Sequence, residues 1–218
     1  MSKIFNLMEN QLEDQWSKLA DKGSVEATIA ALKNNNIDAH FVASGAEAKN
    51  KVLELIPQGS EVMASSSVTL QSVGLLAEID ESGKYVSIRK KVFSLDKNTQ
   101  GKEMKLLRSV PDFAIGSVHA VTEQGQVLIA SASGSQLPAY AYGANHVIWV
   151  VGTQKIVKDI DAGIKRIYEH SLPLETERVK KAYGWPSSSV NKILIFAKEA
   201  LPLKGRTTLI FVNEVLGF

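Results

Sequence analysis

Short apolar runs alternate with amphipathic stretches from Asp38 to the end of the chain. The apolar runs are rich in valine, isoleucine and phenylalanine, a composition that is typical of strands buried inside a sheet. The last two runs follow each other closely and are expected to form a terminal pair of strands. We predict strands over residues 38–44, 61–65, 112–117, 126–131, 146–152, 192–199 and 207–216.

The stretches between these runs have apolar residues at every third or fourth position, which places them on one face of a helix. This alternation of strands and helices predicts an α/β fold with a mostly parallel sheet and helices on both faces. Residues 85–89 are expected to form a short edge strand, and the GWPSSS segment at 184–189 a surface loop. The predicted helices span residues 47–56, 69–79, 97–109, 159–170 and 174–183.

Two more helices are predicted before the first strand. An apolar stripe at residues 5–19 indicates an amphipathic helix, and Ser24 can cap a second helix that ends at the asparagine run 34–36. We divide the chain accordingly into an N-terminal helical extension, residues 1–36, and an α/β domain, residues 37–218. The stripe would pack on that domain or, alternatively, form the surface of a homodimer.

Composition narrows the functional classes. A net charge of +2 with scattered lysines and arginines does not favour a nucleic-acid partner. The longest apolar runs fall far short of the ~20 residues that a membrane helix requires. The first residues lack the apolar core of a signal peptide, so we expect a cytoplasmic protein without a membrane partner. The chain has no cysteine, which excludes disulfides, thiolate nucleophiles and cysteine-bound iron–sulfur clusters. The histidines other than His119 have no partner at ligand spacing, so we predict no metal site.

Two turns rich in serine follow predicted strands. Ser65–Ser67 precede a helix that begins near Thr69, and residues 131–135 precede a short helix from about Pro138. Because the carboxyl ends of parallel strands meet at one edge of a sheet, the two turns can form a shared cradle for a phosphate or carboxylate. The alternative is that the serines only cap the two helices. The candidate ligand-binding residues in the turns are Ser66, Ser67, Thr69, Ser133, Gly134, Ser135 and Gln136.

The segment between the two turns contains the candidate catalytic groups. Glu123 lies at a strand end within a Glu-Gln-Gly step, four residues after His119. A carboxylate that faces the cradle there acts as a base or a covalent nucleophile. Alternatively, Glu123 is a solvated residue of a hairpin turn. Gly116, Ser117 and Gly125 complete the predicted cleft. Neither serine turn matches the phosphate-loop or dinucleotide fingerprint, so the pattern identifies no cofactor.

Four stretches indicate a family relationship. They are SSSVTLQSVGL at 65–75, SVHAVTEQGQV at 117–127, the block from YGANHVIWVVG to IYEHSLPLE at 142–175, and GRTTLIFVNEVLGF at 205–218. Together they resemble the LUD (lactate-utilisation) domain family in its stand-alone form, over nearly the whole chain. The resemblance implies a fold similar to that of ribose-phosphate isomerase, glucosamine-phosphate deaminase and the CoA transferases. In that group, strand-end clefts bind sugar phosphates, CoA esters or nucleotides.

The resemblance also implies a link to lactate oxidation, because some family members work beside iron–sulfur and flavin subunits. This cysteine-free chain departs from the members that hold clusters. Ser133–Gln136 stand where many relatives have Thr-Gly-Asn-Arg, and His119 stands where many have asparagine. Thr122–Gly125 resembles the Ser-Glu-Asn-Gly turn that holds the catalytic glutamate of CoA transferases.

The sequence is compatible with three functions. The first is a protein of lactate or organic-acid utilisation, an enzyme or a binding protein, that takes a small anionic or phosphorylated ligand in the strand-end cleft. The second is a non-catalytic accessory subunit, whose partners are the other components of a lactate-oxidising assembly. The third is a transferase of CoA esters or acyl groups that uses Glu123. Stabilisation by a small ligand would separate the first and third functions from the second.

Overall fold

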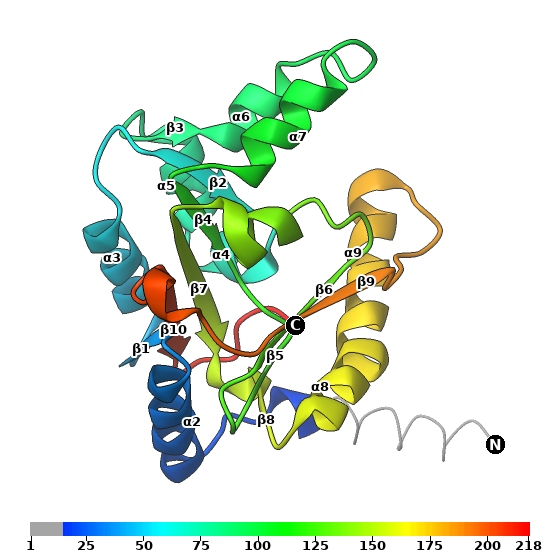
Figure 1. The fold of residues 1–218 in the computed structure, drawn as a ribbon. Coiled ribbons are helices and arrows are strands. Elements are labelled where there is room, and N and C mark those ends of the chain that lie inside the picture. Colours follow the sequence, from blue (N-terminus) through cyan, green and yellow to red (C-terminus); the bar gives the residue numbers. More distant parts are fainter. Residues whose placement is uncertain (1–14) are drawn as a thin grey trace, which may run out of the picture.

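A six-stranded parallel sheet forms the centre of the molecule (Figure 1). The computed structural model describes residues 15–218, so most of the helix expected at residues 5–19 lies outside the described residues. Every neighbouring pair in this sheet is parallel, which confirms the expected α/β fold. The strands lie in the order β1 (Asp38–Val42), β10 (Thr207–Val212), β7 (His146–Gly152), β4 (Phe113–Gly116), β2 (Glu61–Ala64) and β3 (Val86–Ser87).

A second, four-stranded sheet adds to the expected architecture. Strands β5 and β6 form an antiparallel hairpin, β9 continues the sheet antiparallel to β6, and β8 pairs in parallel with β5. The order is β8 (Ile156–Val157), β5 (Ala120–Thr122), β6 (Val127–Ser131) and β9 (Lys192–Phe196).

The expected terminal pair of strands is wrong, because β9 and β10 lie in different sheets. Strand β10 (TTLIFV) is buried along its whole length and lies between β1 and β7. Strand β9 (KILIF) is partly exposed and lies at the edge of the small sheet. A run that is apolar on both faces suits a central parallel strand, whereas a half-exposed run suits an edge. Burial, and not nearness in the sequence, therefore decides where each strand pairs.

Helices cover the sheets, and some end where the sequence did not indicate. The helix expected at 69–79 breaks at Gly74, whose φ of 72° is incompatible with a right-handed helix. The edge strand expected at 85–89 is confined to β3, because the Ser87 side chain caps a new helix. Among the described residues, no helix has the length and apolar character needed to cross a bilayer. The α-helices are α2 (Lys22–Asn34), α3 (Gly45–Leu55), α4 (Val68–Ser72), α5 (Leu75–Glu81), α6 (Ile88–Phe93), α7 (Gly101–Ser109), α8 (Ile160–Arg166) and α9 (Leu172–Tyr183).

The core lies on both faces of the large sheet. On β7, Trp149 belongs to one apolar cluster and its neighbour Val150 to the other, because successive side chains of a strand point to opposite faces. The cluster around Val150 packs against α3, α4 and α5. The cluster around Trp149 packs against α2, α6, α7 and the inner face of the small sheet. The outer face of the small sheet is covered by α8. The small sheet is thus a layer of its own beside the large one.

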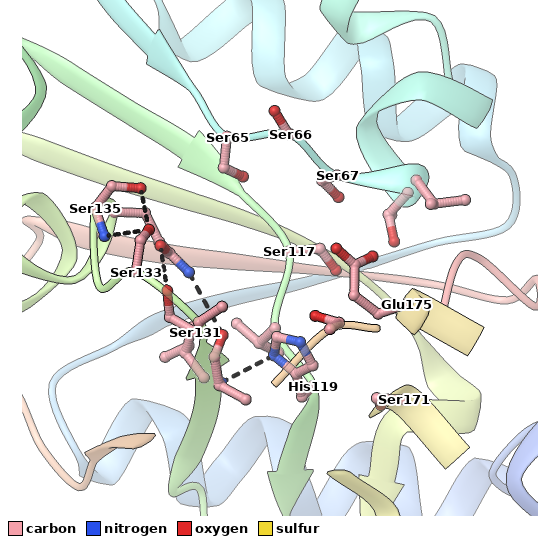
Figure 2. A pocket seen from close by; sticks show the side chains of 18 of the residues that line it. Ser65, Ser66, Ser67, Ser117, His119, Ser131, Ser133, Ser135, Ser171 and Glu175 are labelled. Carbon is pink, nitrogen blue, oxygen red and sulfur yellow. Dashed lines mark hydrogen bonds between the residues drawn. The ribbon is translucent and has the colours of Figure 1, made fainter. Parts of the chain in front are cut away.

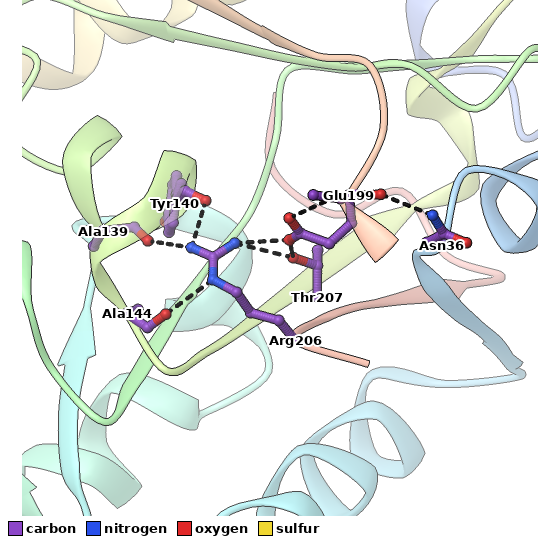
Figure 3. A network of polar contacts seen from close by, with 8 residues as sticks. Asn36, Ala139, Tyr140, Ala144, Glu199, Arg206 and Thr207 are labelled. Carbon is purple, nitrogen blue, oxygen red and sulfur yellow. Dashed lines mark hydrogen bonds and ion pairs between the residues drawn. The ribbon is translucent and has the colours of Figure 1, made fainter. Parts of the chain in front are cut away.

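A buried ion pair fixes the turn that precedes β7 (Figure 3). The Arg206 guanidinium donates to a Glu199 carboxylate oxygen at 2.8 Å, and both side chains are about 95% buried. Its other N–H groups donate to the backbone carbonyls of Ala139, Tyr140 and Ala144, each at 2.9 Å. These carbonyls belong to or follow the π-helical turn η1 (Ala139–Gly143). Arg206 therefore holds η1 against the end of the large sheet.

The asparagine run after α2 is hydrogen-bonded to Glu199, one member of this buried ion pair. Asn36 has a φ of 58°, in the left-handed region that asparagine tolerates, which agrees with the turn expected there. Its side-chain amide donates to the Glu199 carbonyl at 2.8 Å, and the Glu199 N–H donates to the Asn35 carbonyl at 2.9 Å. Helix α2 is therefore joined to the core through the segment that holds Glu199.

Candidate functional site

A pocket of about 390 Å³ lies where strands β2, β4, β6 and β7 end (Figure 2). Ser65 follows β2, Ser117 follows β4, Ser131 ends β6, and Lys155 follows β7 after a short turn. Helices α6 and α9 supply further wall residues. The volume is within the range of small-molecule sites, and the carboxyl ends of strands are the usual location of ligand sites in α/β proteins.

The structure brings both serine turns to this pocket. In Figure 2, Ser65–Ser67 lie above the cavity and Ser131–Ser135 lie on its left, with Ser117 near the centre of the view and His119 below it. The residues predicted from the sequence that line the pocket are Ser66, Ser67, Thr69, Ser117, His119, Ser133, Ser135 and Gln136.

The serine side chains also serve the local structure, as the capping alternative expects. The Ser67 hydroxyl accepts from the backbone N–H of Leu70 at 3.3 Å and so caps α4. The Ser131 hydroxyl accepts from the Gly134 N–H at 2.8 Å and donates to Gln136 at 3.0 Å. Capping and pocket lining therefore occur in the same turns.

Two predicted glycines, Gly116 and Gly134, do not line the pocket but lie next to residues that do. A Cβ atom on Gly116 would lie 1.8 Å from the Tyr140 hydroxyl oxygen and 2.8 Å from the Ser65 hydroxyl oxygen, so only glycine fits there. Tyr140 is buried and lines the pocket. Burial raises the pKa of its phenol to about 12, so the group stays protonated. Gly134 adopts a φ of 83° at the second serine turn, beside the Lys192 side chain.

The expectation that Glu123 faces the same cleft is wrong. His119 precedes β5 at its pocket end, and Glu123 follows β5 at the opposite end, so the strand separates them. The turn that contains Glu123 packs on the end of α2, where the Asn35 amide donates to the carbonyl of Gly125 at 3.2 Å. A Cβ atom on Gly125 would lie 2.8 Å from the backbone of Ala31. Neither Glu123 nor Gly125 lines the pocket, and the hairpin-turn interpretation fits their position.

Lys155 is the most unusual residue of the pocket wall, and the sequence did not indicate it. A 3₁₀ turn directly after β7 holds it, and only 1% of the residue is exposed. Its ammonium nitrogen donates to the hydroxyls of Thr69 at 3.3 Å and Ser117 at 3.2 Å. No carboxylate of the described residues lies within ion-pair distance of it. Burial, together with the positive charge of Arg166, lowers the pKa of the amine well below its ordinary value.

Arg166 places a second buried cation behind Lys155. The residue ends α8, is fully buried, and donates from Nη1 to the His119 carbonyl at 2.6 Å and the Ser171 hydroxyl at 3.2 Å. Its Nε and Nη2 groups have no hydrogen-bond partner among the described residues. Burial lowers the pKa of the guanidinium to about 10, which leaves it charged at neutral pH. No carboxylate of the described residues bonds to the Arg166 guanidinium.

His119 is a neutral hydrogen-bonding group in this setting. Its Nδ1 accepts from the Ala130 N–H at 3.1 Å, so the proton of the neutral ring is on Nε2. Burial, followed by the positive charges of Lys155 and Arg166, lowers the pKa of the imidazole to about 3. Without a carboxylate partner, His119 can donate a hydrogen bond to a ligand.

The remaining charged groups of the wall are mostly basic. Arg89, Arg108 and Arg178 line the pocket together with Lys155, against Glu175 as the one acidic side chain among the described lining residues. That carboxylate is already paired with Arg178 through two bonds of 2.7 Å. The pocket as a whole is therefore basic and suited to an anion.

Fold and pocket together define an α/β protein with a basic cavity at the strand ends. The family model described as LUD domain matches residues 25–203, and the chain belongs to the LUD domain family. A solved structure with the same fold is that of a DUF162 family protein from Deinococcus radiodurans. It is 11% identical, has a TM-score of 0.54, and the match covers 89% of this chain and 99% of that one. No curated protein sequence matches this chain significantly.

Proposed function

We propose that this protein serves lactate or organic-acid utilisation by binding a small anionic or phosphorylated molecule in the basic pocket. The observation that supports this most strongly is Lys155, which is buried in the pocket wall with hydroxyls as its only hydrogen-bond partners among the described residues. Membership of the LUD domain family supports the metabolic role.

Charge balance is the physical reason to expect an anion. An uncompensated buried cation costs several kcal/mol, because the solvation that water provides is lost. A carboxylate or phosphate in the pocket would supply negative charge near the Arg166 guanidinium, which pairs with no carboxylate of the described residues. The guanidinium groups of Arg89, Arg108 and Arg178 would favour its approach from solvent. The serine hydroxyls would supply directional hydrogen bonds to its oxygens.

The two alternatives make different demands on the structure. A CoA transferase that uses Glu123 needs this carboxylate in the cleft, and its position against α2 argues against that mechanism. An accessory subunit without a ligand needs no basic pocket. It predicts that small anions leave the stability of the protein unchanged.

Thermal unfolding tests the proposal. Lactate, pyruvate, sugar phosphates and CoA esters would be added separately to the protein. A ligand present at 100 times its Kd stabilises the folded state by about 2.7 kcal/mol, or about 5 to 11 °C in melting temperature for a chain of this size.

Two variants test whether the stabilising ligand binds beside Lys155. Lys155→Met replaces the amine with an apolar group of similar length, and Lys158→Met is the matched control at an exposed lysine. We expect Lys155→Met to fold and to lose most of the ligand-induced shift, while Lys158→Met keeps it. Stabilisation of wild type and Lys155→Met to the same degree would place the ligand elsewhere. No stabilisation of wild type by any of the compounds would favour the accessory role.

A further inference from the structure

The amine of Lys155 has the surroundings of a nucleophile. Among the lysines that the structure describes, it alone is buried, and it is part of a cavity wall. Both of its hydrogen-bond partners are hydroxyls, those of Thr69 and Ser117. An ammonium group that serves only as a structural cation is normally paired with a carboxylate when it is buried.

We propose that Lys155 is a catalytic residue that forms an imine with a small aldehyde or ketone bearing a carboxylate or phosphate. This inference rests on the proposed function, since the basic pocket would bind the anionic group while the amine reacts with the carbonyl.

The hydrogen bonds of Lys155 leave its lone pair free. A neutral amine has two N–H bonds, and the two hydroxyl oxygens at 3.2 and 3.3 Å provide one acceptor for each. The Thr69 hydroxyl directs its own hydrogen to the Leu216 carbonyl at 3.0 Å, so its oxygen faces the amine as an acceptor. With both hydrogens engaged, the nitrogen lone pair is available for a bond to carbon.

The neighbouring charges favour the reactive form of the amine. The lowered pKa of Lys155, caused by burial and then by Arg166, increases the fraction of neutral amine at pH 7. Desolvation and an adjacent cation are the two means by which proteins activate lysines for reaction with carbonyl groups. An ordinary lysine, with a pKa of about 10.4, is neutral to only about 0.04% at this pH.

The proposed step is balanced without any further reactant. The Nζ lone pair forms a bond to the carbonyl carbon, and the carbonyl oxygen takes up a proton to give a carbinolamine. The carbon–oxygen bond then breaks and the oxygen leaves as water, which includes both hydrogens of the original amine. The product is a carbon–nitrogen double bond between Lys155 and the substrate, and no oxidant or reductant is consumed.

Reductive trapping tests the imine. The protein would be incubated with sodium cyanoborohydride and one of four compounds: pyruvate, glyceraldehyde 3-phosphate, acetone or lactate. Reduction fixes an imine as a secondary amine, with a mass gain equal to the carbonyl compound less one oxygen atom. Intact-mass measurement and peptide mapping then identify the modified lysine. Pyruvate and the phosphorylated aldehyde distinguish a carboxylate from a phosphate, acetone lacks an anionic group, and lactate lacks a carbonyl.

We expect Lys155 to be labelled by pyruvate or by the phosphorylated aldehyde about 100-fold faster than Lys158, with little labelling by acetone and none by lactate. Lys155→Met should lose this label, and Lys158→Met should keep it. If the first variant fails to fold, peptide mapping of the wild-type protein still decides which lysine reacts.

The outcomes separate this inference from the proposed function. A carbonyl compound that raises the melting temperature without labelling Lys155 would leave anion binding intact and overturn the imine. Labelling spread evenly over exposed lysines would overturn it as well. Absence of both stabilisation and labelling would overturn the imine and the proposed ligand together.

Discussion

Replacement of Arg206 by methionine should destabilise the protein strongly. The variant would leave the Glu199 carboxylate, which is about 96% buried, without its cationic partner. It would also remove the hydrogen bonds that hold the carbonyls of Ala139, Tyr140 and Ala144. Loss of one member of a buried ion pair costs about 3 to 5 kcal/mol. For a chain of this length, that corresponds to a fall in melting temperature of about 6 to 20 °C.

Urea unfolding, followed by the fluorescence of the buried Trp149, would measure the loss. The matched control is the exposed pair of Lys91 and Glu61, whose nitrogen and oxygen atoms lie at a similar distance, 2.9 Å. Lys91→Met should cost less than about 1 kcal/mol, because solvent weakens exposed pairs.

The double variant Glu199→Gln with Arg206→Met separates the charge from the packing. Removal of both charges should recover part of the loss, because no buried carboxylate is left unpaired. If Arg206→Met costs no more than Lys91→Met, the ion pair does not hold η1 and the reasoning fails.

Three further perturbations test other parts of the structure. Gly116→Ala should displace Tyr140, lower the free energy of unfolding by about 1 to 3 kcal/mol and weaken any ligand-induced thermal shift. An unchanged stability and an unchanged thermal shift would contradict the close contact at this glycine. His119 has a lowered pKa, so the unfolded chain takes up its proton first as the pH falls through about 6.5, and stability falls with it. Between pH 7.5 and pH 5, the free energy of unfolding of wild type should therefore fall by about 2 kcal/mol more than that of His119→Asn. His146→Asn is the control. Equal losses in wild type and His119→Asn would show that the His119 ring is not held neutral. Glu123→Gln should leave ligand-induced stabilisation unchanged. Loss of the ligand-induced thermal shift in this variant would show that Glu123 takes part in ligand binding.

Much of the fold follows from local patterns. The apolar runs of β4 and β7 and the helical periodicity of α8 are signals that neighbouring residues create by themselves. The first serine turn follows β2 of the large parallel sheet, whereas the second follows β6 of the small sheet, so the two turns meet through the packing of the two sheets and not through one shared parallel sheet.

The decisive residues of the pocket could not be found in this way. Lys155 and Arg166 are ordinary basic residues in the sequence, and only the packing of several elements shows that they are buried without a carboxylate partner from residues 15–218. Glu123 was misplaced because it is only four positions after His119 in the sequence, which suggests that the two side chains are close. Strand β5 occupies the positions between them, so the two residues lie at opposite ends of that strand. The 184–189 loop was expected only to cover the surface, yet Trp185, Ser188 and Ser189 line the pocket.

The π-helical turn η3 (Ile167–Ser171) lies between α8 and α9, with the Leu172 N–H bonded to the Ile167 carbonyl five positions earlier. Such a turn contains one residue more than an α-helix would. Because the wide turn takes up this extra residue locally, loss of a single residue there would let α8 and α9 merge into a regular helix whose two halves keep their present facing. Glu175 and Arg178 would then stay in the pocket wall although their positions in the sequence shift by one. Relatives of this chain that lack one residue at this point would consequently present the same helix face to the pocket, and an alignment that closes the gap elsewhere would compare residues that face in different directions.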